Sequence, residues 1–500
     1  MLDIARHLPV LVVVVPLLAG PICALLPAGR VPWGFATLVG WATFALAALL
    51  LAAVVTGGPI SYALGGWAPP LGIEYYIDLA NALVLFLVAG IAAAVFPYAG
   101  PSVADEVDHE QTALFYSALL VCFAGLLGVA ATGDAFNIFV FLEISSLSTY
   151  ALVAMGAKRD RRALVAAFNY LVMGTIGATF FVIGVGLLYM ATGTLNLLDI
   201  QDRITGDDNR MIRAGLAFVV VGVGLKLAMF PLHLWLPNAY AFAPSAVSAF
   251  LAATATKVAV YVMVRFLFSV YGTLFEFEQL TLHAVLLPLA ALGMTAASLV
   301  AVFQSDVKRL LAYSSVAQIG YMLLGLSLGS VSGLTASLAH VFNHALMKGA
   351  LFMAIGCVAL RLGATSCAAL AGLGRRMPAT TGALVIGGLS LIGVPGTVGF
   401  ISKWYLLEAT FEAGWQPAAF LVVASSLLAV IYVGRLLEPA LLREAPAEGP
   451  LSGPVKEAPL LMLIPMWGLV AANVYFGFDA SFTGGVAEAA AEQLLGEGGR

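Results

Sequence analysis

The chain is a series of long apolar stretches separated by short segments that hold most of its prolines and charged residues. A stretch of about 20 apolar residues is long enough for a helix to cross the hydrocarbon core of a membrane. Hydropathy and the punctuating residues predict about fourteen such spans. They lie near residues 9–27, 33–56, 77–97, 112–131, 134–155, 163–192, 212–236, 245–271, 281–303, 308–328, 332–360, 378–409, 417–438 and 458–480. The pattern therefore predicts an all-α polytopic membrane protein.

The composition agrees with this fold class. Hydrophobic residues make up 61% of the 500 residues and charged residues 10%, with a mean hydropathy of +1.00, which excludes a water-soluble globular protein. The formal net charge of −4 is small and scattered, so no nucleic-acid partner is expected. The four cysteines form no CxxC pair. We therefore expect no cofactor and no redox chemistry within this chain.

The basic loop KRDRR, residues 158–162, predicts the orientation in the membrane. Lys and Arg residues in short loops are retained on the cytoplasmic side, and most other basic loop residues fall on the same predicted side. The first apolar stretch has no small-residue cleavage signal and is interpreted as a span. We expect a protein of the cell (inner or cytoplasmic) membrane with both termini on the outer side.

Four charged residues lie deep inside predicted spans, namely Glu143, Lys226, Lys257 and Lys403. An ionised side chain at this depth costs ~2.5–3.5 kcal/mol on insertion scales, so each one needs a physical reason. One reason is an ion pathway, in which the amines and the carboxylate exchange protons. The alternative is a set of static ion pairs that hold helices together.

Prolines interrupt two of these spans beside a lysine. Pro231 and Pro237 follow Lys226, and Pro395 lies in the run GVPGTVGF just before Lys403. Proline cannot continue a regular helix, and non-helical backbone is tolerated at membrane depth only where it meets protein or water. Paired broken helices in two halves of a transporter are typical of an ion pathway.

The stretch HVFNHALMK places His340, His344 and Lys348 on one helix face. Such a stripe favours a proton relay or the lining of a wet cavity, and satisfied interhelical hydrogen bonds are the alternative. HxxxH also occurs in zinc sites, but the glutamate of HExxH is missing, so no metal site is predicted. Lys348 and His233, the latter near the cytoplasmic end of its predicted span, are secondary candidates.

Two further charged residues, Arg265 and Glu408, lie near the ends of predicted spans. Long side chains near helix ends usually extend toward the polar surface of the membrane. We therefore expect both residues to lie at that surface and outside the pathway.

Five segments together resemble the antiporter-like membrane subunits shared by respiratory complex I, membrane-bound hydrogenases and Mrp-type cation/proton antiporters. The segments are FLEISSLSTYAL (141–152), KLAMFPLHLWLPNAYAFAPSAVSAFLAATATKVAVYVMVR (226–265), SDVKRLLAYSSVAQIGYM (305–322), HVFNHALMKGALFM (340–353) and GVPGTVGFISKW (393–404). The resemblance covers nearly the whole chain. Within the superfamily the chain looks most similar to the D subunit of Mrp antiporters, although Asn238 and the wording GTVGF depart from the usual pattern.

The resemblance implies a division of the chain. Residues 1–111 would form helices 1–3, residues 112–271 and 281–438 two inverted five-helix repeats with a broken helix in each, and residues 439–500 a loop, helix 14 and an outer tail. It also implies that Glu143 pairs with Lys226. The implied polar axis consists of Glu143, Lys226, Lys257, His340, His344 and Lys403.

The function implied is that of a subunit of a monovalent cation (Na⁺)/proton antiporter, which works with other membrane subunits and is not itself an enzyme. A first alternative is a proton-pumping subunit of NADH:quinone oxidoreductase (complex I) or of a membrane-bound hydrogenase. A second alternative is a scaffold that transports nothing. The transported species would be protons and a monovalent cation.

Overall fold

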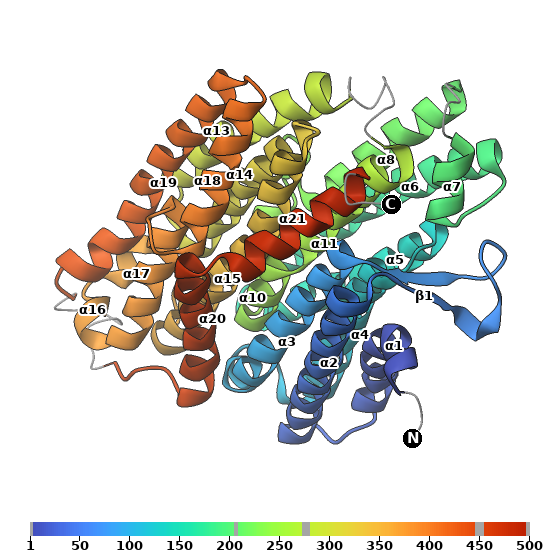
Figure 1. Ribbon diagram of the computed structural model, residues 1–500. Coiled ribbons are helices and arrows are strands. Elements are labelled where there is room, and N and C mark those ends of the chain that lie inside the picture. Colours follow the sequence, from blue (N-terminus) through green and yellow to red (C-terminus); the bar gives the residue numbers. More distant parts are fainter. Residues whose placement is uncertain (1–3, 205–208, 273–280, 446–454, 497–500) are drawn as a thin grey trace.

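The computed structural model describes residues 4–204, 209–272, 281–445 and 455–496, and nearly all of this part is helical (Figure 1). The helices of the first half are α1 (Ile4–Ala24), α2 (Arg30–Gly57), α3 (Leu79–Glu106), α4 (Thr112–Ala131), α5 (Ala135–Ala154), α6 (Arg162–Thr192), α7 (Leu197–Ile204), α8 (Arg210–Leu227), α9 (Leu236–Phe242), α10 (Ser245–Ala253) and α11 (Ala255–Val264), which the π-helix η4 (Arg265–Tyr271) extends.

The helices of the second half begin after the π-helix η5 (Thr281–Leu286). They are α13 (Leu287–Val302), α14 (Val307–Ser327), α15 (Val331–Leu362), α16 (Leu373–Arg376), α17 (Pro378–Ile392), α18 (Val398–Glu412), α19 (Gln416–Leu442), α20 (Leu460–Phe478) and α21 (Ser481–Leu495). Short 3₁₀ turns are η1 (Leu64–Gly66), η2 (His109–Gln111), η3 (Met155–Lys158) and η6 (Cys367–Leu370).

Twelve helical segments in the described part are long and apolar enough to cross a membrane. The other two predicted spans, 212–236 and 378–409, correspond to interrupted helices, α8 followed by α9 and α17 followed by α18. The prediction of an all-α, multi-pass membrane protein is therefore confirmed. The inverted symmetry of the two halves stays a prediction.

The first interruption begins at Ala228, whose φ of 60° ends α8 in the left-handed region. Pro231 lies within the following non-helical segment. Pro237 lies in the first turn of α9, where the missing N–H costs nothing because it would have no intrahelical partner. Pro231 is thus inside the interruption, and Pro237 marks the place where the helix resumes.

Two further interruptions lie elsewhere in the bundle. Gly393, at φ 97°, ends α17, and Pro395 lies in the non-helical segment before α18. The span Ser245–Tyr271 is interrupted at Thr254, where α10 gives way to α11 at φ −126° and ψ −59°. No proline or glycine marks this third interruption, and the sequence did not predict it.

Helix α15 lies at the centre of the molecule (Figure 1). It packs against α3, α10, α14, α17, α18, α20 and α21. Every residue from Gly333 to Ala359 is buried. The polar side chains of this stretch are therefore surrounded by protein and do not face lipid.

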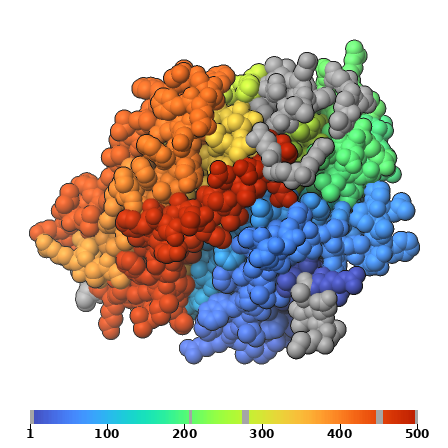
Figure 2. All heavy atoms as spheres, in the orientation of Figure 1, coloured from blue at the N-terminus to red at the C-terminus, as the bar shows by residue number. Residues whose placement is uncertain are grey.

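Two elements were not predicted. A β-hairpin connects α2 to α3, with β1 (Ile60–Ala63) antiparallel to β2 (Glu74–Ile77). Helix α21 lies within the predicted outer tail and crosses the front of the molecule, between the second-half helices and the N-terminal helices (Figure 2). The ring of Phe482 anchors it through contacts with Phe86, Phe342 and Phe476.

Candidate ion pathway

Glu143 of α5 and Lys226 of α8 form an ion pair. The Lys226 Nζ donates to Glu143 Oε1 at 3.0 Å and to Ser146 Oγ at 2.7 Å. The side chain of Glu143 is 23% exposed and that of Lys226 is 8% exposed. Lys226 lies in the last turn of α8, directly before the interruption. The expected contact is present, and its role in transport stays a prediction.

Lys257 is fully buried at the third interruption. Its Nζ donates to the carbonyl of Ala252 and lies 3.4 Å from Thr256 Oγ1. The last carbonyls of a helix lack intrahelical donors, so the end of α10 provides an acceptor for the amine. Among the described residues Lys257 forms no ion pair with a carboxylate. The interruption at Thr254 therefore supplies the polar partner that the sequence did not reveal.

Lys403 belongs to α18, and its amine lies at the end of α17, just as the amine of Lys257 lies at the end of α10. Its Nζ donates to the carbonyls of Leu391 and Ile392 at 3.0 and 2.9 Å and to Ser426 Oγ at 3.1 Å. It also lies 4.8 Å from the centre of the Tyr321 ring. The negative end of a helix dipole and the face of an aromatic ring both favour a cation. The interruption between α17 and α18 thus supplies the polar groups that bind the amine of Lys403.

The two histidines of α15 lie between these lysines. The ring nitrogens of His340 are 2.8 Å from Ser402 Oγ and 2.9 Å from Gln318 Oε1. The rings of His340 and His344 are parallel within 3°, with centroids 5.8 Å apart. Neither nitrogen of His344 has a partner among the described residues. Both ring nitrogens of His344 therefore keep their capacity to donate or accept a hydrogen bond, and a part of His344 in proton transfer stays a prediction.

The two secondary candidates differ in their surroundings. Lys348 is fully buried and donates to the carbonyl of Leu311, at 2.8 Å, and to Ser314 on α14. His233 lies in the interruption between α8 and α9, is 6% exposed and stacks on Phe230. It is therefore buried in the protein and does not lie at an exposed end of its span.

The side chains form two groups. Glu143 and Lys226 make the first. In the second, the amines of Lys257, Lys348 and Lys403 all interact electrostatically with the ring of His344. Lysines can carry or release a proton, and imidazoles can accept one and pass it on. Side chains of these types can pass protons in steps, and proton movement within either group or between the two groups stays a prediction.

Sequence reasoning was wrong about Arg265. Its guanidinium is buried and donates to both carboxylate oxygens of Asp78, at 2.6 and 2.7 Å. It also donates to Tyr261 Oη at 3.0 Å and to Ser269 Oγ at 3.1 Å. Arg265 therefore ties η4 to the start of α3 and does not reach the membrane surface.

A second buried carboxylate was also missed. Glu106, at the end of α3, accepts from the N–H and hydroxyl of Ser245 at 2.5 and 2.6 Å and from Arg159 at 3.1 Å. Lys308 lies in the same cluster, which lines a cavity of about 230 Å³ at the KRDRR end. Glu106 belongs to the acidic segment DEVDHE, whose sequence gives no indication that one of its acids is buried.

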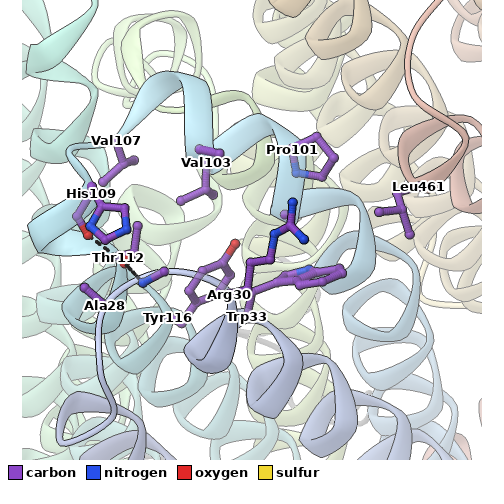
Figure 3. A pocket seen from close by; sticks show the side chains of 13 residues that line it. Ala28, Arg30, Trp33, Pro101, Val103, Val107, His109, Thr112, Tyr116 and Leu461 are labelled. Atoms are coloured by element: carbon purple, nitrogen blue, oxygen red, sulfur yellow. Dashed lines mark hydrogen bonds between the residues drawn. The ribbon is translucent and has the colours of Figure 1, made fainter.

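A larger cavity, about 640 Å³, opens between the α1–α2 loop, α3 and α4 (Figure 3). Arg30, Trp33 and Tyr116 project along its wall. The loop is held by the Gly29 N–H, which donates to Thr112 Oγ1 at 2.8 Å. The walls are mainly apolar, and none of the pathway side chains lines them.

Across residues 4–204, 209–272, 281–445 and 455–496, no three His, Cys, Asp or Glu side chains gather closely enough to hold a metal ion. The ring nitrogens of His340 bind a hydroxyl and an amide oxygen, as described above.

Comparison with known sequences identifies the family of the chain. The family described as NADH:quinone oxidoreductase/Mrp antiporter, TM matches residues 132–429. The N subunit of NADH-quinone oxidoreductase from Desulforudis audaxviator (strain MP104C) is 44% identical, over 92% of this chain and 93% of that protein. The D subunit of the Na(+)/H(+) antiporter from Bacillus subtilis (strain 168) is 29% identical, over 92% and 91%. Of these two relatives, the oxidoreductase protein is the more similar. The identities therefore do not support the expectation that the chain is most similar to the D subunit of an antiporter.

Two solved multi-subunit complexes contain a chain of the same fold. In the Mrp complex from Dietzia sp. DQ12-45-1b the TM-score is 0.90 at 25% identity, covering 99% of this chain and 98% of that one. In the membrane-bound sulfane sulfur reductase (MBS), an archaeal respiratory membrane complex, it is 0.89 at 30% identity, covering 98% of each chain. This chain belongs to the NADH:quinone oxidoreductase/Mrp antiporter transmembrane family.

Proposed function

We propose that this chain is a proton-translocating subunit of a multi-subunit membrane complex. The observation that carries the proposal is that the amines of Lys226, Lys257 and Lys403 each lie at a helix interruption; Lys257 and Lys403 are buried, and the side chain of Lys226 is 8% exposed. Interrupting three spans and burying three amines is costly, and ion pairs alone would not need the interruptions. A pathway needs both features, because freed backbone carbonyls stabilise the charged forms of Lys257 and Lys403, and the carboxylate of Glu143 stabilises that of Lys226.

The mechanism is electrostatic. When Lys226 is protonated, the carboxylate of Glu143 at 3.0 Å neutralises it. A proton added to Glu143 leaves the positive charge of Lys226 without a partner. A proton lost from Lys226 leaves the negative charge of Glu143 without a partner. Since fields are weakly screened in the interior, the change alters the proton affinity of Lys257 and, through His344 and His340, of Lys403. Protons then enter and leave from opposite sides of the membrane in alternation.

We further propose that the complex is a monovalent cation/proton antiporter. The supporting observation is the similarity, over nearly the whole length, to a protein of a Na(+)/H(+) antiporter and to a chain of an Mrp complex. A second candidate is a redox-driven complex, favoured by the 44% identity to a protein of NADH-quinone oxidoreductase. In both cases the chain would use the same pathway, and the source of energy would differ.

Proton flux in inverted membrane vesicles that contain the whole complex distinguishes the two. An antiporter acidifies or alkalises the lumen in response to a Na⁺ pulse without an electron donor, whereas a redox pump responds to an electron donor without Na⁺. Vesicles with Lys226→Ala should lose the flux and retain the assembled complex. Unchanged flux in that variant would contradict the pathway and favour the scaffold.

A further inference from the structure

A cleft of about 910 Å³ lies on the face opposite the KRDRR loop, which is predicted to be the outer face. It is formed by the start of α15, the end of α18 and the start of α21, the helix that crosses the front of Figure 2. None of the functional assignments above includes it. Its location near the second half of the polar axis makes its chemistry relevant to transport.

The charge of the cleft has one sign. Glu408 and Glu412 project from successive turns of α18, and Glu488 joins them from α21. None of the three forms an ion pair within the described part of the chain, and no Lys, Arg or His lines the cleft. A cleft lined by one sign of charge concentrates counter-ions about 10- to 1,000-fold.

A hydroxyl group at the base of the cleft has no partner. Thr335 lines the cleft and is 9% exposed, and its Oγ1 makes no hydrogen bond with any described residue. The hydroxyl of Tyr405 lies against Gly484 of α21, so α18 and α21 close together around the same space. Carboxylate and hydroxyl oxygens are hard ligands, which suit alkali and alkaline-earth cations and their hydration shells.

The cleft is close to the outer end of the polar axis. Thr335 precedes His340 by about 7 Å along α15, and Tyr405 follows Ser402 by about 5 Å along α18. His340 and Ser402 are hydrogen-bonded to each other at 2.8 Å. The base of the cleft is therefore about one and a half turns of helix from His340, a group of the proposed pathway.

We propose that this cleft binds a hydrated monovalent cation at the outer mouth of the polar axis. The cation keeps its water because, in the described ranges, no three acidic, His or Cys groups converge closely enough to replace it. Glu408, Glu412 and Glu488 hold it by charge, and Thr335 accepts or donates a hydrogen bond at the base. The role in transport rests on the proposed function, whereas the binding itself does not.

Binding is tested on the purified complex in neutral-lipid nanodiscs, with Mn²⁺ as a hydrated probe whose electron paramagnetic resonance signal falls on binding. The triple variant Glu408→Gln, Glu412→Gln, Glu488→Gln should bind Mn²⁺ about tenfold more weakly than wild type. Na⁺ should displace the probe from wild type. Thr335→Val, which keeps the shape and removes the hydroxyl, should weaken binding about two- to tenfold.

Glu492→Gln is the matched control, because it removes the same charge from α21 outside the cleft and should leave Mn²⁺ binding unchanged. Equal binding by wild type and the triple variant, with both complexes intact by size-exclusion chromatography, would overturn the proposal. So would an equal loss in the control.

Transport gives a second readout. In proteoliposomes the triple variant should raise the KM for outer Na⁺ about tenfold and change the maximal rate less than about twofold. Added choline chloride should reduce this difference, because salt screens exposed charges. An unchanged KM would count against the cleft. If wild type shows no Na⁺-dependent flux, the antiporter proposal fails, and the Mn²⁺ titration still decides the cleft.

Discussion

The ion pair between Glu143 and Lys226 allows the sharpest test of pathway against static pairing. At 3.0 Å and an effective dielectric constant of about 20, the attraction between the two charges is roughly 5.5 kcal/mol before desolvation is subtracted. Removing one partner of a buried pair usually costs about 3–5 kcal/mol, since the other charge is left uncompensated. The 23% exposure of Glu143 places the expected cost of Lys226→Ala near the lower end, about 3 kcal/mol.

The decisive variant is the neutral double substitution Glu143→Gln with Lys226→Met. Replacing both charges by neutral groups of similar volume is often neutral for stability. The apparent melting temperature of the purified complex should therefore fall in each single variant and recover in the double variant. Proton flux in proteoliposomes should be lost in all three, because none retains both titrating groups.

The static-pair hypothesis makes the opposite forecast for flux. If the pair only joins α5 to α8, the double variant should transport at the wild-type rate once its stability has recovered. That result would refute our reasoning. A matched control is Arg443→Gln, which breaks an exposed pair with Glu438 at the protein surface and should change neither flux nor melting temperature by a measurable amount.

Three further predictions concern individual contacts. Lys403→Met removes the donor to the Leu391 and Ile392 carbonyls and should stop flux and destabilise the complex by about 1–3 kcal/mol, measured as flux and as melting temperature. Asp78→Asn should cost about 3–5 kcal/mol by leaving the guanidinium of Arg265 unpaired; a melting temperature equal to wild type would show that the pair is dispensable. The hydrogen bond from Arg162 lowers the pKa of Asp160. The stabilisation that this lowered pKa gives is present above the ordinary carboxyl pKa and is lost as the pH falls through the lowered value. The drop in melting temperature on acidification from about pH 6 to about pH 3 should therefore be slightly smaller in Asp160→Asn than in wild type. An identical drop in wild type and variant would contradict this linkage between the pKa and stability.

The spans were predictable because lipid imposes a length and a composition on every one of them. The interruptions at Pro231 and Pro395 were also predictable, since proline acts locally. The interruption at Thr254 was not, because the stretch LAATATK contains residues that commonly occur in regular helices. It arises where tertiary packing and the amine of Lys257 compensate the lost backbone hydrogen bonds.

Long-range partners were the other limit. Asp78 and Arg265 are separated by most of the first half of the chain, and neither residue carries a local signal of the other. The resemblance supplied the pairing of Glu143 with Lys226, which composition and spacing did not determine. The acidic cleft likewise depends on α21 folding back beside α18, and the residues beyond the last predicted span indicated only a tail.

Proton flux through complexes that carry Lys257→Met tests the central claim most directly, because Lys257 is fully buried, belongs to the second group of titrating side chains and forms no ion pair in the described structure. The purified complex would be reconstituted in proteoliposomes with a pH-sensitive dye inside, and energised by whichever driver, Na⁺ or an electron donor, supports flux in wild type. We predict an assembled complex without proton flux. Flux at the wild-type rate would contradict the claim that protons cross the membrane through this chain.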